Sequence, residues 1–171
     1  MLESIYIENF AIIDRLEVDF HNHMTVLTGE TGAGKSIIID AIGQLMGNRS
    51  QSSFIKADCD ECFIEGAFTI GAKSPVLNKL KEYRIDYEDK LVVSKSFNRD
   101  NKSIIKINYR NVSKMVLQSI MADLIDIHSQ FETHSLFDAE NHLIILDEFI
   151  NQPLKKLFQT YSLAYRTYRE I

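Results

Sequence analysis

The stretch Gly29-Glu30-Thr31-Gly32-Ala33-Gly34-Lys35-Ser36 decides the fold of this 171-residue chain. It matches the phosphate-loop pattern G-x-x-x-x-G-K-S/T at every position. The glycines let successive backbone N–H groups face inward as a nest for an anion, and the following helix adds the positive end of its dipole. We expect Lys35 to reach the β- and γ-phosphates and the Ser36 hydroxyl to ligate Mg²⁺. The sequence therefore predicts a nucleotide site.

The residues on both sides of this loop have the matching periodicity. Met24-Thr25-Val26-Leu27-Thr28 is a compact apolar run that predicts a strand ending at Gly29. Residues 35–46 are apolar nearly all round, which predicts a helix buried on several sides. Strand, loop and helix in this order indicate an α/β fold of the P-loop NTPase class.

The rest of the chain alternates between strand and helix patterns. The first 28 residues predict β structure, and residues 90–97 and 104–107 predict a hairpin turning through 99–102. Further strands are expected at 63–70 and 124–127. Helices are expected at 74–83, 113–121 and 138–150, capped by Ser74 (with Pro75 as the first helical residue), Ser113 and Asp138.

Composition limits the class of protein. The chain is 45% hydrophobic and 25% charged with a net charge of −5, which is typical of a soluble globular domain and not of a strongly basic nucleic-acid binder. No apolar run approaches ~20 residues and the start lacks signal-peptide features, so we expect no membrane partner and a cytoplasmic location. Cys59 and Cys62 have the spacing of half a zinc site but no second pair, so we expect no zinc.

Basic residues are concentrated in the predicted hairpin region. Residues 90–114 hold seven lysines and arginines against one aspartate. One interpretation is a local contact with DNA phosphates through Lys102, Lys106 and Arg110. The other is that the lysines protect an exposed edge strand from aggregation. Both remain open at this point.

The last residues predict a coiled-coil helix. Apolar side chains step by three and four, as an a/d seam requires. Packing of this face against the domain is the alternative interpretation. We therefore expect one domain at 1–152 and the beginning of a coiled-coil helix at 153–171. The seam consists of Leu154, Leu157, Tyr161, Ala164, Tyr168 and Ile171.

The segments that carry a family resemblance are Ile7-Glu8-Asn9-Phe10-Ala11-Ile12-Ile13-Asp14, Met24-Thr25-Val26-Leu27, the phosphate loop with Ile37-Ile38-Ile39-Asp40-Ala41-Ile42, Leu45-Met46-Gly47-Asn48-Arg49-Ser50, Leu124-Ile125-Asp126-Ile127-His128-Ser129-Gln130, and His142-Leu143 through Leu146-Asp147-Glu148-Phe149. Together they resemble the RecN family of bacterial DNA repair ATPases, which are of the structural-maintenance-of-chromosomes (SMC) type. The resemblance extends over roughly residues 2–150 and is most specific in the first 50. His23 stands where the family usually has glycine, and Ser129 and Phe131 also depart from its pattern.

The resemblance implies the N-terminal lobe of an ABC-type head that binds ATP with Mg²⁺ between two heads and acts on DNA during double-strand-break repair. By position, Gln130 matches the glutamine that senses Mg²⁺ and the γ-phosphate, and Arg49 matches a basic residue near the nucleotide and the DNA-facing surface. The implied partners are a C-terminal lobe and coiled coil of the same protein, a second head, and DNA.

Leu143-Ile144-Ile145-Leu146-Asp147-Glu148 imitates a Walker B motif, in which Asp147 would hold Mg²⁺ and Glu148 would polarise the attacking water. No Leu-Ser-Gly-Gly-type signature precedes it, and its spacing continues the helix from Asp138, so we favour a helix. On this interpretation the chain alone binds nucleotide but hardly hydrolyses it. The alternatives are a self-contained P-loop kinase or nucleotide switch that uses Asp147 and Glu148, and a non-enzymatic fragment that pairs through residues 154–171.

Overall fold

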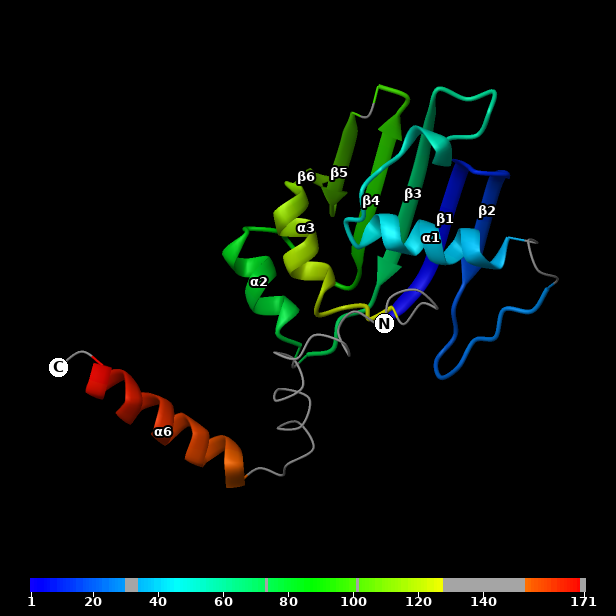
Figure 1. The fold of residues 1–171 in the computed structure, drawn as a ribbon. Helices are drawn as coiled ribbons and strands as arrows, with labels where there is room; N and C mark the ends of the chain where they lie inside the picture. Colours follow the sequence, from blue (N-terminus) through cyan, green and yellow to red (C-terminus); the bar gives the residue numbers. More distant parts are fainter. Residues whose placement is uncertain (30–33, 73, 101, 128–152, 170–171) are drawn as a thin grey trace. The chain divides into compact units, whose positions relative to one another are not determined.

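The computed structural model describes residues 1–29, 34–72, 74–100, 102–127 and 153–169. These residues belong to two compact units, Met1–Ile127 and His128–Ile171, and each is described by itself (Figure 1). The first unit contains a mixed α/β arrangement of one sheet with helices, and the second contributes helix α6 (Pro153–Arg169).

The six-stranded sheet of the first unit has the order β2-β1-β3-β4-β5-β6, and every pairing is antiparallel. Two sets of neighbours in sequence, β1–β2 and β3–β4–β5–β6, are joined by the pairing of β1 with β3. The strands are β1 (Leu2–Phe10), β2 (Ile13–Asp19), β3 (Glu61–Phe68), β4 (Leu91–Asn98), β5 (Ser103–Ile107) and β6 (Arg110–Asn111).

The helices of this unit pack on one face of the sheet (Figure 1). Helix α1 contacts β1, β3 and β4, while α3 contacts β5 and α2. The inward-facing side chains of the central strands, such as Ile7, Ile64 and Val93, are completely buried beneath them. The elements are α1 (Lys35–Leu45), the 3₁₀ turn η1 (Ser52–Phe54), α2 (Val76–Glu82) and α3 (Lys114–Met121).

Side chains alternate between the two faces of the sheet, as strand geometry requires. In β4 the residues 91, 93, 95 and 97 are buried, and those between them are half-buried. The edge strand β2 carries four charged residues in seven, and charges on an edge strand disfavour pairing with another chain.

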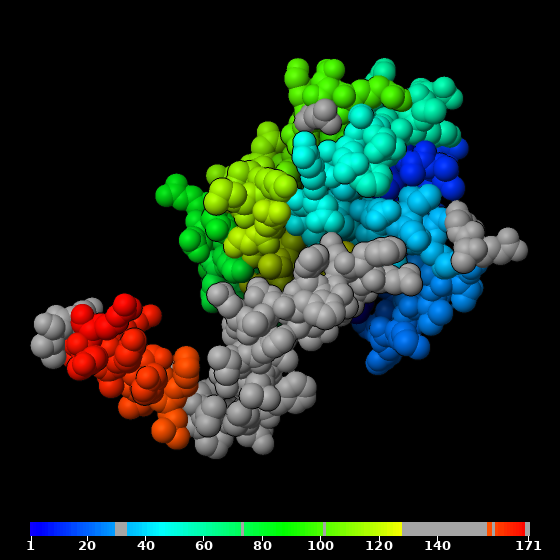
Figure 2. Space-filling model, viewed as in Figure 1, coloured from blue at the N-terminus to red at the C-terminus, as the bar shows by residue number. Residues whose placement is uncertain are grey.

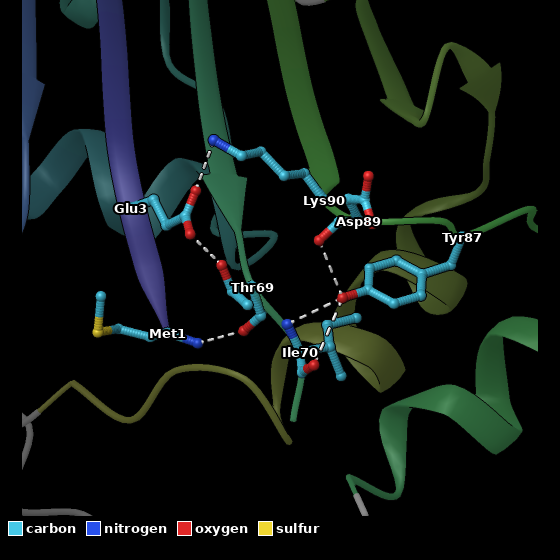
Figure 3. Close-up of polar contacts among 7 residues, drawn as sticks. All are labelled: Met1, Glu3, Thr69, Ile70, Tyr87, Asp89 and Lys90. Atoms are coloured by element: carbon cyan, nitrogen blue, oxygen red, sulfur yellow. Dashed lines mark hydrogen bonds and ion pairs between the residues drawn. The ribbon is translucent and has the colours of Figure 1, made fainter. Parts of the chain in front are cut away.

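A set of polar contacts joins the start of β1 to the residue after the C-terminal end of β3 and to the loop before β4 (Figure 3). The Met1 amino group donates to the Thr69 carbonyl at 2.5 Å, and Lys90 pairs with Glu3 at 2.8 Å. The Thr69 hydroxyl also donates to the Glu3 carboxylate. Hydrogen bonding to Lys90, and then to Thr69, lowers the pKa of Glu3. These contacts fix the sheet end opposite the β4–β5 turn.

Most predicted elements are confirmed, but two predicted strands are absent. Residues 24–28 and 124–127 form no strand in the structure, because neither segment has a ladder partner among the described residues. Ser113 caps α3 as predicted, accepting a hydrogen bond from the Val116 amide at 3.4 Å. Ser74 accepts from the Val76 amide, although the N-cap position itself is held by Pro75 rather than by Ser74. The helix predicted at 138–150 lies outside the described residues.

The second unit is described only through α6. Its predicted seam residues Leu157, Tyr161 and Tyr168 are 64–75% exposed. Tyr161 and Tyr165 stack with ring centroids 6.0 Å apart. Among the described residues, no helix has the length and apolarity needed to span a membrane.

Candidate nucleotide site

The phosphate loop leads directly into the first turn of α1. Gly34 is the N-cap residue with φ +95°, a left-handed conformation that glycine adopts without steric cost. Lys35 begins the helix, and its ammonium group donates to the Gly29 carbonyl, which brings the two ends of the loop together. The Ser36 side chain is exposed at the same turn. Glu30, Thr31, Gly32 and Ala33 lie outside the described residues.

The segment that enters the loop is exposed rather than embedded in the sheet. Met24 is 84% exposed and Val26 is 65% exposed, and Figure 2 shows residues 20–29 in lighter blue at the surface of the first unit. His23, which stands where the RecN family usually has glycine, has φ +80°. A histidine in this left-handed region carries backbone strain that glycine would not.

A cavity of about 440 Å³ lies between the β1–β2 turn and the start of α1. Ile12, Ile13 and Ile38 give it apolar surface, while Lys35 and Asp14 add charge. An apolar wall next to the phosphate-loop lysine suits a nucleotide, whose base is apolar on both faces and whose phosphates are anionic. The complete lining is Ile12, Ile13, Asp14, Arg15, Leu16, Leu27, Thr28, Gly34, Lys35 and Ile38.

The chemistry of the donor set fits Mg²⁺ as far as the described residues extend. Ser36 offers a hydroxyl oxygen, the hard ligand that Mg²⁺ prefers, at the first turn of α1. Gln130, the second predicted ligand, and Asp147 and Glu148, the Walker B alternative, lie outside the described residues. The roles of Gln130, Asp147 and Glu148 therefore stay predictions from the sequence.

The structure does not bring the predicted DNA-contact residues together. Arg49 follows the C-terminal end of α1, the end opposite the phosphate loop. Lys102 lies in the β4–β5 turn, and Lys106 pairs with Ser94 on the sheet face turned away from the helices. Arg110 donates to the Arg84 carbonyl at the far end of the hairpin. The four residues thus lie at four separate places on the first unit.

A buried lysine was missed by the sequence interpretation. Lys95 is 3% exposed and lies between Val93 and Phe97 on the helix-covered face of β4. Its ammonium donates to the Gln44 side-chain oxygen at 2.9 Å and to the Asn48 carbonyl at 2.8 Å. Burial, and then the charge of Lys114, lower the pKa of Lys95 to about 8. The signal was present, because the alternation of β4 places position 95 inward.

The cysteine pair shows no sign of a metal site. Burial raises the pKa of the Cys62 thiol to about 12, which opposes the thiolate that zinc needs. Within the described ranges, no group of three or more His, Cys, Asp or Glu side chains is arranged to hold a metal ion.

A protein-family model described as an AAA domain matches residues 4–171, which is nearly the whole chain. The chain belongs to the AAA domain family. Its phosphate-loop sequence and mixed α/β fold are those of a P-loop domain, and the fold is similar to that of solved SMC and RecF structures. This confirms the predicted fold class.

The chain is also similar to curated DNA repair proteins named RecN, as the sequence resemblance predicted. It is 40% identical over 169 residues to RecN of Bacillus subtilis, covering 98% of this chain and 29% of that protein. Identity to RecN of Halalkalibacterium halodurans is also 40%, over 98% of this chain and 30% of that protein. The chain thus spans less than a third of the length of these relatives.

Solved structures show the same fold. A chain from work on ATP-driven dimerization and DNA-stimulated activation of SMC ATPases superposes with a TM-score of 0.61 at 18% identity, covering 95% of this chain and 98% of that one. An Smc head bound to the C-terminal winged-helix domain of ScpA gives a TM-score of 0.59 at 21% identity, covering 73% and 40%. At these identities the likeness concerns the fold alone.

Proposed function

We propose that this chain is the ATP-binding N-terminal part of a RecN-like, SMC-type ATPase that acts in the repair of DNA double-strand breaks. The observation that carries the proposal is the phosphate loop closed by Lys35 on Gly29, at the start of α1 and beside a cavity with one apolar wall. Similarity to RecN over 98% of the chain supports the choice of process.

In the proposed complex each part of the site has one task. The backbone amides of residues 29–34 and the N-terminal end of α1 surround the phosphates. Lys35 leaves the Gly29 carbonyl and pairs with the β- and γ-phosphate oxygens. Ser36 and Gln130 would hold Mg²⁺, which would supply positive charge against the phosphates. The base and ribose lie against Ile12, Ile13 and Ile38.

The exposed segment before the loop supports the proposal that the lobe is incomplete alone. Residues 24–28 have a strand pattern but no ladder partner among the described residues, and Leu27 remains 39% exposed. Burial of such a segment against a C-terminal lobe would satisfy its backbone and remove its apolar surface from water. We infer that the partners of this chain are a C-terminal lobe and coiled coil of the same protein and a second head.

Catalysis of phosphoryl transfer depends on positioning and on charge stabilisation around the γ-phosphate. We infer that the attacking water is polarised by a carboxylate of the C-terminal lobe, and that a signature loop of a second head closes over the ATP. The chain alone then binds ATP and turns it over negligibly.

Calorimetric titration of the chain with ATP and Mg²⁺ tests the proposed site. We expect binding that falls at least about tenfold in Lys35→Ala, because the charge-assisted contacts to the phosphates are lost. Lys102→Gln is the matched control, since it removes an exposed lysine of the β4–β5 turn that does not line the cavity beside the phosphate loop, and it should bind ATP as the wild type does. Equal ATP affinity in Lys35→Ala and wild type would contradict the site.

A steady-state ATPase assay distinguishes the alternative of a self-contained P-loop kinase or switch. Turnover comparable to a complete enzyme, abolished by Glu148→Gln, would establish Asp147 and Glu148 as a working Walker B pair. Negligible turnover that the substitution does not change is the outcome we expect.

DNA binding by the hairpin is a separate part of the proposal. Neutralising Lys102, Lys106 and Arg110 together should weaken binding to a DNA duplex and flatten its salt dependence. An unchanged salt slope would exclude this hairpin as a DNA contact.

Pairing through the C-terminal helix is tested by sedimentation with and without residues 154–171, where an unchanged oligomeric state would argue against it.

A further inference from the structure

A second cationic cavity lies at the C-terminal end of α1. Its volume is about 320 Å³, and three cationic side chains line it, Arg49, Lys95 and Lys114. Asn48, Ser50 and Ser103 add an amide and two hydroxyl groups, and Ile105 is the one apolar lining residue. Helix α1 has 11 residues, which at 1.5 Å per residue separates this cavity from the phosphate loop by roughly 16 Å.

The elements around this cavity hold its cations at fixed places. Ladder pairing sets Lys95 of β4 opposite Ile105 of β5, and Lys114 begins α3 after its Ser113 cap. The turn after α1 is tied to α3, since the Gln118 side chain donates to the Gly47 carbonyl at 3.3 Å. Arg49 lies two residues beyond that tie. The positions of the three charges are therefore set by strand register, a helix cap and a turn.

The charge of the cavity is not balanced by the protein. The lining contains no carboxylate, and none of the three cations forms an ion pair within the described part of the chain. Lys95 donates only to neutral oxygens, those of Gln44 and Asn48. A buried ammonium costs several kcal/mol unless a counter-charge offsets it. An anion in the cavity would supply that counter-charge.

The lining also indicates which anion fits. Two hydroxyls, an amide and three cations are donors suited to the several oxygens of one phosphate group. The lining offers no aromatic ring and only Ile105 as apolar surface, so nothing in it would receive a nucleobase. The cavity is open to solvent beside exposed Arg49 and Lys114, so a phosphate attached to a larger molecule can enter.

We propose that Arg49, Lys95 and Lys114 form a binding site for a phosphate group, separate from the nucleotide site at the other end of α1. The group is either a phosphodiester of a DNA backbone or a free phosphate. Lys95 forms the floor of the site, and Arg49 and Lys114 contact the anion from the rim. This inference does not depend on ATP binding at the phosphate loop.

The test uses the 171-residue chain carrying Lys35→Ala, so that binding at the phosphate loop does not contribute. Inorganic phosphate is titrated at constant ionic strength, with amide NMR shifts of residues 48–50, 103 and 114 as the readout. We expect saturable shifts, and at least a tenfold loss of affinity in Arg49→Gln/Lys114→Gln. Both side chains are exposed, so the double variant keeps the fold. Lys81→Gln removes an exposed lysine of α2 that does not line the cavity; it is the matched control and should leave the shifts unchanged.

A second arm identifies the source of the phosphate. A fluorescent 20-bp DNA duplex is titrated at several salt concentrations against the same variants. If DNA supplies the group, the double variant lowers the slope of log K against log salt by about one, because the contact with one phosphate is lost. If only inorganic phosphate responds to the double substitution, the site takes a free phosphate. If neither ligand responds to it, the proposal is wrong. Loss of ATP binding in Lys35→Ala alone tests the nucleotide site and leaves these outcomes unaffected.

Discussion

The two halves of helix α1 differ in what surrounds them. All four buried residues of the helix, Ala41, Gly43, Gln44 and Leu45, lie in its C-terminal half, against β3 and β4. In the N-terminal half Ile37 and Ile38 are half-buried and Ile39 is 44% exposed. One end of the helix is thus anchored by packing, whereas the other is left open next to the phosphate loop. In the proposed function, the open end of α1 binds the nucleotide and the packed end holds the helix in place.

The largest expected effect tests this difference in packing. Leu45→Ala should lower the free energy of unfolding by about 3 kcal/mol, because Leu45 is fully buried over Gly66 and the truncation leaves a cavity. Ile39→Ala is the matched variant on the open half and should cost less than about 1 kcal/mol. Urea unfolding at pH 7 measures both. Equal losses would mean that the two halves are packed alike.

The second prediction compares the glycines at the two ends. Gly34 and Gly47 have nearly the same φ, +95° and +96°, but a Cβ at Gly34 meets nothing within 4 Å, whereas one at Gly47 lies 2.6 Å from Gln118 Cγ. Gly34→Ala should cost about 1 kcal/mol of stability from the left-handed backbone alone. Gly47→Ala should cost about 2 kcal/mol, because the side chain that joins α1 to α3 must also move. Unfolding without nucleotide measures the difference, and Gly47→Ala/Gln118→Ala should restore part of it.

The third prediction concerns pH at the anchored end. Lys95 has a pKa of about 8 in the folded chain, below its ordinary value of 10.5, so the unfolded chain binds more protons between these values. Stability therefore rises with pH across this window. Relative to Lys95→Met, the wild type should gain on the order of 2 kcal/mol from pH 7 to pH 10. Urea unfolding of both at pH 7, 8.5 and 10 gives the comparison. If the difference in stability between wild type and Lys95→Met were the same at all three pH values, burial would not lower the pKa of Lys95.

The smallest effect is expected in the segment that leads to the open end. His23→Gly should raise the free energy of unfolding by up to about 1 kcal/mol, since glycine relieves the strain of φ +80°. His21→Gly is the control: it lies in the same exposed segment without a positive φ, and should be neutral or destabilising. Thermal unfolding of the three chains is sufficient. A higher midpoint of thermal unfolding for His21→Gly than for His23→Gly would contradict backbone strain at His23.

Much of this architecture could be predicted from the sequence, because local patterns determine it. Alternation identified the strands β1 to β5, and Ser113 identified the start of α3. Residues 24–28 were predicted as a strand but do not form one, because a strand requires a ladder partner. The sequence of one segment carries no information on whether its partner is present. The burial of Ile39 was over-predicted for a related reason, since an apolar pattern does not show whether another part of the protein covers each side chain.

The phosphate loop was predictable because its chemistry is contiguous in the chain. The second cavity was not, because its cations come from a turn, a strand and a helix that only the folded chain brings together. The basic composition of residues 90–114 pointed to the right region but to other residues. Side-chain direction, set by ladder register, separates inward Lys95 from outward Lys106.

The pairing of β1 with β3 has a consequence for how the chain folds. The hairpin β1–β2 and the meander β3–β4–β5 each consist of neighbours in sequence, whereas Ile7 and Ile64 are brought together across a long connection that contains the phosphate loop. Closing such a connection costs more chain entropy than closing a hairpin turn, so we expect this step to limit the folding rate. During synthesis, β1 has to wait with one edge unpaired until β3 has left the ribosome.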